Sequence, residues 1–424
     1  KYKAKVRLKG DLEGHWLSKY RMSLRIELIN EKSIFGYTKM SLQKPREREY
    51  PYDHVFQDLN HKIGNMSSNH KYVHIYVNGV DWGIMDLEEH ISKEFLEKQN
   101  KNDSPIFRFT DEKGWFYNIT SNNPYKWYLL ANKDLLLRDG FNTFHPEFYN
   151  SGRYLKDYHN RKILSYISKK YRNHDVELYD IDSFSKAYFL ATFWGTAHAL
   201  ANSNSKYYFN PYTLKVEPIT LDSGHLWLLT GPHDIGGTYL IPSQYETILS
   251  SSNYAENFDK NLKYVRDMVA PNIKNYFDSV HKFFPVDKIK NPQEVVLDNI
   301  DKVFNSKEKY SPESVNRLFE DIRKARDDIK FALPTKQQAS EFQDHIYARH
   351  YTDGKLELYN LLPDEVIIKS IIINNKSVID NEITIPSYLS NRSPTVINTK
   401  YLGLKDEMFT INTKYQEFNR ATKN

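Results

Sequence analysis

The spacing of the hydrophobic residues changes twice along the chain, and this change limits the possible folds more than any other feature. In the first hundred residues, apolar and polar side chains alternate over short segments, which is typical of β-strands. From about residue 105 to residue 334 the apolar residues recur at helical spacing, and short β-rich runs return beyond residue 340. We therefore expect an α+β protein with domains at residues 1–104, 105–339 and 340–424.

The first domain has the pattern of a small twisted sheet that carries one or two helices. Three short segments have strand patterns: residues 3–8, 22–28 and 39–43. Asn78-Gly79 joins two further strands, residues 72–77 and 81–87, because Asn-Gly supplies the two positive φ angles of a type I′ turn. Helical spacing predicts a helix over residues 54–63, and a second helix is expected to start near Ser92.

The second domain is expected to be mainly helical, with one β-hairpin. Asp182 is a candidate N-cap for a helix that follows it. Asn210-Pro211 is a strong turn signal between two strand-like segments, residues 206–209 and 215–220. Four short β runs follow in the third domain: residues 346–351, 355–359, 366–373 and 396–399. These runs predict a separable β-sandwich-like module.

The composition excludes several classes of protein. The chain has no cysteine, which excludes a disulfide scaffold, a thiol nucleophile and a metal bound by cysteine. Its longest apolar stretch, residues 187–194, is far shorter than the ~20 residues that cross a bilayer. The net charge is only +5, with acidic and basic residues interleaved, so we expect no nucleic-acid partner. Because the strand pattern starts almost at Lys1, we expect that any targeting signal has been removed.

Five short motifs occur in a fixed order within the first hundred residues. They are Arg7-Leu-Lys-Gly-Asp11, Arg21-Met-Ser-Leu-Arg25-Ile, Leu42-Gln-x-Pro45-Arg46, Val77-Asn-Gly79-x-x-Trp-Gly83 and Leu87-Glu-Glu-His-Ile91. Together they resemble the CotH family of atypical, secreted kinases, in the branch found with surface-polysaccharide genes. The resemblance covers roughly residues 1–225. It implies a kinase-like two-lobed fold, use of ATP with Mg²⁺ or Mn²⁺, and an acceptor outside the cytoplasm that is a protein or a glycan.

The resemblance assigns nucleotide-binding roles to three charged residues. Arg21 lies where the family has a basic residue, and Arg25 shares its face of the strand because the two are four residues apart. Glu89 is expected to pair with the Arg21 cation, as a kinase glutamate pairs with its lysine. The alternative for Arg21 and for Glu89 is an ordinary solvent-facing charge.

Asp222 is the strongest candidate for a metal ligand. It follows the apolar residues 216–220 and precedes Ser223-Gly224, so it lies at a strand end before a sharp turn. By the resemblance it holds the catalytic metal together with an upstream asparagine, which is Asn204 or the equally spaced Asn202. The alternative is an Asx turn that only caps the strand.

One segment departs from the family pattern. The family has a catalytic aspartate shortly before the asparagine, whereas residues 196–204 contain no aspartate and His198 is their only titratable side chain. His198 could accept the acceptor proton, or it could be a core or helix-capping residue. We therefore expect a kinase-like phosphotransferase, with two alternatives. One is a pseudokinase or nucleotide-binding scaffold, and the other is a polysaccharide-associated structural protein that works through its C-terminal module.

Overall fold

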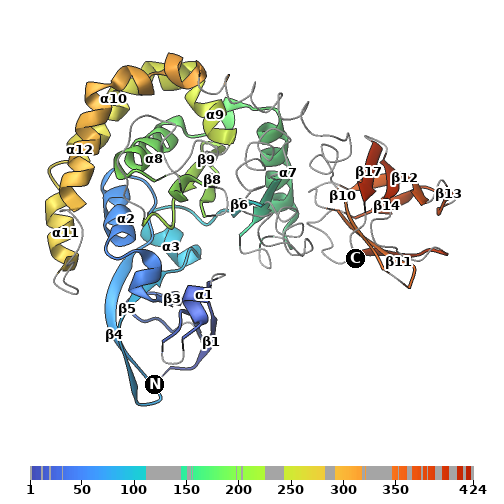
Figure 1. Cartoon of the computed structure of the whole chain (residues 1–424), viewed down its shortest axis with the longest axis horizontal. Coiled ribbons are helices and arrows are strands. Elements are labelled where there is room, and N and C mark those ends of the chain that lie inside the picture. Colours follow the sequence, from blue (N-terminus) through green and yellow to red (C-terminus); the bar gives the residue numbers. More distant parts are fainter. Residues whose placement is uncertain are drawn as a thin grey trace. The chain divides into compact units, whose positions relative to one another are not determined.

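The structure is a computed structural model of the whole chain (Figure 1). It describes residues 2–10, 13–18, 21–30, 32–110, 145–149, 154, 156–196, 198–201, 204–224, 243–281, 292–317, 320, 346–351, 353–360, 365–373, 376–379, 381–386, 394–400, 408–413 and 417–421. The chain divides into two compact units. The first consists of Lys1–Ile106 and Val176–Asn316, and the second of Phe107–Asp175 and Arg317–Asn424. The boundaries expected at residues 104 and 339 stay predictions.

The first unit begins with the predicted antiparallel sheet. Its strands are β1 (Ala4–Leu8), β2 (Leu24–Leu28), β3 (Lys39–Gln43), β4 (His70–Val77) and β5 (Val80–Glu89). They lie in the order β1-β2-β3-β5-β4. Asn78 and Gly79, which link β4 to β5, have φ angles of 51° and 80°, so the predicted positive-φ turn is confirmed. A short helix, α1 (Glu13–Trp16), lies between β1 and β2.

The two faces of this sheet differ in character, because successive side chains of a strand point to opposite sides. One face carries an apolar core that includes Met40, Leu42, Met85 and Leu87. Because Met85 and Leu87 of β5 belong to this core, the alternation of side chains along the strand places Glu88 on the opposite face. The sheet therefore has one apolar face and one polar face.

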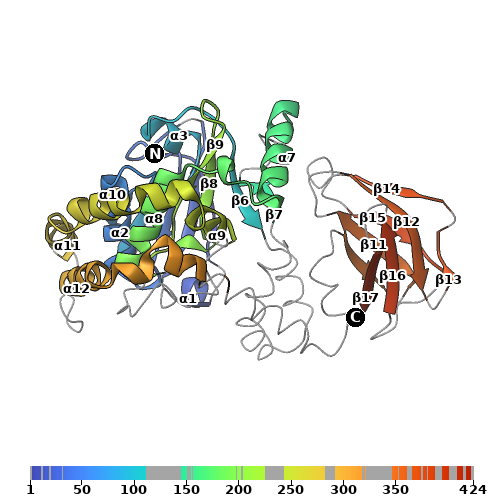
Figure 2. The ribbon, with the colours of Figure 1, turned by 90° about the horizontal axis from the view of Figure 1, so that it is seen from above.

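Helices make up most of the remainder of the first unit. They are α2 (Tyr52–Lys62), α3 (Lys93–Lys98), α8 (Ile181–Trp194), α9 (Ser243–Leu249), α10 (Ser252–Val269), α11 (Ile273–His281) and α12 (Pro292–Asn305). The α8 helix is buried along nearly its whole length and packs beside α10 and α12 (Figures 1 and 2). Its N-cap is Asp180, which accepts a hydrogen bond from the Ser183 backbone at 2.9 Å. The prediction of Asp182 is wrong, because that side chain pairs with Lys186 one turn later in the same helix.

Four short 3₁₀ helices and one hairpin complete the described part of the first unit. The 3₁₀ helices are η1 (Pro45–Arg48), η2 (Val176–Leu178) and η3 (His198–Leu200), and a fourth, η6 (Lys307–Tyr310), follows α12. The predicted hairpin consists of β8 (Lys206–Asn210) and β9 (Lys215–Ile219), which pair antiparallel. The Asn210 side chain accepts hydrogen bonds from the backbone of the turn, as the Asn-Pro signal predicted. Asp222 follows shortly after the end of β9 at Ile219.

The described residues of the second unit form two groups of elements. The first group is β6 (Ile106–Thr110), β7 (His145–Phe148) and α7 (Tyr158–Arg172). The second is a set of C-terminal strands: β10 (Ile346–His350), β11 (Lys355–Asn360), β12 (Val366–Ile373), β13 (Lys376–Ser377), β14 (Ile383–Ile385), β15 (Thr395–Asn398), β16 (Met408–Thr413) and β17 (Glu417–Ala421). Four of these strands match the predicted runs, and the sequence pattern missed the other four. The α+β class is thus confirmed, with an antiparallel sheet, a helical middle and small sheets at the end.

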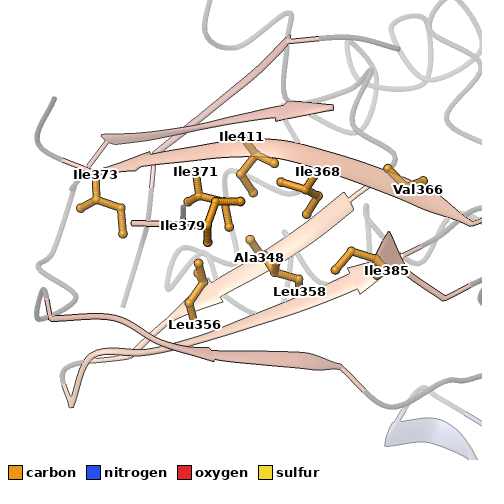
Figure 3. Close-up of a cluster of buried hydrophobic side chains, with 10 residues drawn as sticks. All are labelled: Ala348, Leu356, Leu358, Val366, Ile368, Ile371, Ile373, Ile379, Ile385 and Ile411. Atoms are coloured by element: carbon orange, nitrogen blue, oxygen red, sulfur yellow. The ribbon is translucent and has the colours of Figure 1, made fainter. Parts of the chain in front are cut away.

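The C-terminal strands form two sheets that share one hydrophobic core. Strands β10, β11 and β15 make one sheet, and β12, β13, β14, β16 and β17 make the other. Figure 3 shows side chains from both sheets, such as Leu358 and Ile368, pointing into the same apolar cluster. None of the helices in the part of the chain described by the structure is long and apolar enough to cross a membrane.

We expect Ile368→Ala to destabilise the C-terminal sheets by about 2–5 kcal/mol, because it removes buried methyl groups and leaves a cavity. Hydrogen exchange of the β12 and β16 amides in the full chain measures this loss. Val396→Ala on β15 is the control, because the Val396 side chain is 50% exposed. Equal protection in the two variants would contradict the assignment of Ile368 to a tightly packed core.

Candidate active site

Glu88 is the centre of a buried cluster of charges on the polar face of the sheet. Its Oε2 atom accepts hydrogen bonds from Lys9 Nζ at 3.0 Å, Gln43 Nε2 at 2.6 Å and Arg48 Nη2 at 2.9 Å. Gln43 is on the neighbouring strand β3, and Lys9 directly follows β1. Three donors from three segments therefore converge on one carboxylate oxygen.

Arg48 connects this sheet to the chain that follows β9. It is the last residue of η1, and Glu49 after it adopts a left-handed conformation, with a φ of 45°, that ends the turn. The side chain of Arg48 is only 13% exposed. Besides Glu88, its guanidinium donates to Asp222 Oδ1, and its Nε lies 3.9 Å from Asp53 Oδ2. A single cation thus lies among three carboxylates.

The turn at Asp222 is fixed by its neighbours. Asp222 has a φ of 60°, a left-handed conformation that aspartate tolerates better than most residues. The backbone N–H and the hydroxyl of Ser223 both donate to Asp53 Oδ1 at 2.9 Å, which ties the turn to the start of α2. A Cβ atom on Gly224 would lie 2.5 Å from the Glu49 Cβ, so only glycine fits at this approach.

His198 lies beside Asp222, and Asn204 contacts the backbone of His198. His198 Nε2 is 3.2 Å from Asp222 Oδ2, and the Asn204 side-chain amide donates to the His198 carbonyl at 3.0 Å. Asn204 therefore supports the backbone of His198 in this structure. Asn202, the other candidate for the metal ligand, lies outside the described residues.

The predicted pairing of Arg21 with Glu89 is wrong. Arg21 donates to the Ile84 carbonyl, and Glu89 instead binds Asn69 at 2.6 Å and Lys98 at 2.7 Å. The reason is the two-residue period of β5, which turns Glu89 to the apolar face of the sheet and Glu88 to the polar face. The buried lysine–glutamate pair on the polar face is instead Lys9 with Glu88.

Arg25 also has a partner within the sheet region, because its guanidinium contacts Nδ1 of His90. The roles of Arg21, Arg25 and Glu89 in nucleotide binding stay predictions. The sequence did contain a signal for Glu88, because Met85 and Leu87 are apolar and alternation places residue 88 opposite them. Arg48 had no such signal, because it lies in a charged segment without periodicity.

Burial and pairing shift the pKa values of these groups in opposite directions. Burial, with Arg48 and Arg25 nearby, lowers the pKa of Lys9 to about 8, although Glu88 opposes the shift. Burial alone would raise the pKa of Glu88, but Arg48 and Lys9 more than offset this and hold it well below its usual range. Burial likewise opposes ionisation of Asp222, and Arg48 and His198 together keep its pKa below the usual range. Both carboxylates are therefore ionised at neutral pH.

The contacts of Asp222 do not fit the metal role that the sequence suggested. Its Oδ1 accepts from Arg48 and its Oδ2 lies against His198, so both oxygens already face positively charged or donor groups. Within the ranges that the structure describes, no group of three or more His, Asp or Glu side chains is placed to hold a metal ion. The assignment of Asp222 and Asn204 as metal ligands stays a prediction.

A buried lysine–glutamate pair next to an aspartate at a strand end is typical of kinase-like phosphoryl-transfer sites. Residues 6–188 match a family model described as CotH kinase protein, so this part of the chain is similar to that family. The match includes Lys9, Arg48 and Glu88 and ends before His198. The match suggests a kinase-like fold and an atypical kinase, an ATP-dependent phosphotransferase with a phosphoacceptor substrate. A search of the curated proteins found no match.

A second buried pair lies on the same face of the sheet, next to Glu88. His70 Nδ1 is 2.9 Å from Asp86 Oδ2, and both side chains are almost fully buried. Burial opposes protonation of His70, but the Asp86 carboxylate more than offsets this and raises the pKa of His70 to about 9. The imidazolium of His70 is therefore part of the folded protein at neutral pH.

We expect the free energy of unfolding to fall as the pH rises from about 6.5 to 9. A histidine whose pKa is raised by folding stabilises the fold fully below its unfolded value near 6.5, and this stabilisation is lost as the pH passes its folded value. Urea unfolding at several pH values measures the trend, and His70→Gln should flatten it. His74→Gln is the control, because His74 forms an exposed pair with Asp81. The same slope in His70→Gln and the parent protein would show that another group causes the trend.

Proposed function

We propose that this protein is an atypical kinase that transfers the γ-phosphoryl group of ATP to a hydroxyl of a protein or glycan outside the cytoplasm. The observation that carries the proposal is the buried pair of Lys9 and Glu88, 3.0 Å apart, in a segment that matches the CotH kinase protein family. The acceptor, the extracytoplasmic location and the polysaccharide-associated branch rest on the resemblance of the sequence motifs. The predicted Mg²⁺ or Mn²⁺ does not enter the proposal, because both oxygens of Asp222 have other partners.

Lys9 is the proposed phosphate-binding cation. In kinase-like sites a lysine held by a glutamate contacts the phosphates of the nucleotide. Glu88 holds the ammonium group of Lys9, while Gln43 and Arg48 hold Glu88 in turn. Because a bound phosphate would add negative charge beside Lys9, its pKa should rise from about 8 when nucleotide binds.

His198 is the proposed general base. The acceptor hydroxyl oxygen forms a bond to the γ-phosphorus, the bond from that phosphorus to the β–γ bridging oxygen breaks, and ADP leaves with the electron pair. The hydroxyl proton moves to His198. Asp222, whose Oδ2 is 3.2 Å from His198 Nε2, would stabilise the imidazolium that forms.

A nucleotide-binding scaffold is the second candidate. It is favoured by the absence of an aspartate from residues 196–204, where the family has its catalytic base. Such a protein would bind ATP through Lys9 in the same way but would not transfer phosphate. Binding and transfer therefore have to be measured separately.

We expect Lys9→Met to weaken ATP binding at least about tenfold, because a charge-assisted hydrogen bond contributes roughly 1.5–3 kcal/mol. Calorimetry measures the affinity, with Mg²⁺ and separately with EDTA. Lys98→Met is a matched control, because it breaks a similar lysine–glutamate pair on the opposite face of the sheet. If both variants bind ATP like the parent protein, Lys9 is not the phosphate-binding residue. If the parent protein binds no ATP at all, the proposed function is wrong.

We expect His198→Ala to bind ATP like the parent protein but to transfer phosphate about 10²–10⁴ times more slowly, as for a lost general base. Transfer of radiolabelled phosphate to a hydroxyl acceptor, or hydrolysis to water, measures the rate. His74→Ala is the control, because His74 is also a half-exposed histidine paired with an aspartate. Transfer by His198→Ala at the parent rate would make His198 structural, and no transfer by the parent protein would favour the scaffold.

A further inference from the structure

We propose that the Arg48 guanidinium takes the place of a divalent metal ion among Glu88, Asp222 and Asp53, so that this cluster binds a divalent cation only when the charge of Arg48 is removed. The inference concerns the protein without nucleotide, and it stands independently of the proposed kinase activity.

The contacts of Arg48 are those of a counter-ion shared by several carboxylates. Nη2 is 2.9 Å from Glu88 Oε2, Nη1 donates to Asp222 Oδ1, and Nε is 3.9 Å from Asp53 Oδ2. The three acids come from β5, the turn after β9 and the start of α2. Arg48 is the residue that pairs with all three of them. Carboxylate oxygens are the ligands that Mg²⁺ and Mn²⁺ prefer, but with Arg48 between them these acids are not placed to hold a metal ion.

A second observation points to the same cluster. Gln43 is fully buried and its amide nitrogen donates to Glu88, yet its amide oxygen has no hydrogen-bond partner among the described residues. A buried, unpartnered amide oxygen adjacent to a carboxylate is an additional oxygen ligand of the type that hard divalent cations take. The guanidinium of Arg48 donates to carboxylates, but it makes no hydrogen bond to this amide oxygen, which a metal ion could take as a ligand.

We do not expect a divalent cation to displace Arg48 from its position among the three carboxylates. Arginine stays protonated under all ordinary conditions, and burial of the side chain makes the loss of its carboxylate partners costly. Its charge also repels any divalent cation that approaches the same oxygens, because the interaction of unit charges a few ångströms apart is strong in a partly buried site. The parent protein should therefore lack measurable affinity for the metal at this cluster.

Removal of the charge of Arg48 reverses this balance. In Arg48→Gln, the three carboxylates would keep their contacts with Lys9, His198 and Ser223 but lose the guanidinium that they share, and the added negative charge would attract a cation. Arg48→Lys keeps one positive charge in the cluster, so it should exclude the metal as the parent protein does. These two variants differ in charge and share the loss of the guanidinium, which separates charge from shape.

The test is a calorimetric titration of the full chain with Mn²⁺ alone, without nucleotide. We expect no saturable binding by the parent protein or by Arg48→Lys, and binding by Arg48→Gln at least about tenfold tighter than by either. Arg48→Gln/Asp222→Asn should lose that binding again. Circular dichroism and thermal unfolding check that each variant is folded.

Two results would overturn the proposal. One is saturable Mn²⁺ binding by the parent protein that Asp222→Asn abolishes, because the metal would then coexist with Arg48. The other is a folded Arg48→Gln that binds no Mn²⁺. If Arg48→Gln does not fold, the comparison of the parent protein with Asp222→Asn still decides between coexistence and exclusion. Failure of ATP binding in a separate titration would contradict the kinase proposal and leave this one untouched.

Discussion

The pairing of one buried guanidinium with three carboxylates is the interaction on which the arrangement of the site depends. A buried cation is stable only when it is fully paired, and Arg48 finds its partners on three separate elements. Glu88 belongs to the sheet, Asp53 to the start of α2 and Asp222 to the turn after β9. Their positions are therefore not independent, because a shift of any one of the three elements leaves the charge of Arg48 less well paired.

The sheet and its hairpin could be predicted from the sequence, because their signals are local. The two-residue period of the strands and the positive φ angles of Asn78-Gly79 do not depend on the rest of the chain. The last two strands, β16 and β17, were missed, although β16 supplies Ile411 to the C-terminal core. That core forms from strands distant in sequence, so burial is decided by pairing that a local pattern does not contain.

The site could be predicted only in part. Asp222 was singled out from its position at a strand end, and His198 and Asn204 from the family pattern; His198 contacts Asp222, and Asn204 contacts the backbone of His198. The choice of Glu89 over Glu88 followed the family motif, whereas the alternation of β5 decides which of the two faces Lys9. Arg48 could not have been found, because its role depends on a contact with a residue 174 positions away. No periodicity or motif reports such a contact.

This separation also has a consequence for how the protein is made. The ribosome adds about 5–20 residues per second, so Asp222 emerges on the order of ten seconds or more after Arg48. During that interval the nascent sheet can form the pair of Arg48 with Glu88, but one further carboxylate and the turn that carries it do not yet exist. Arg48 therefore lacks one of its three carboxylate partners throughout this interval, and the site can close only after the turn at Asp222 has been made.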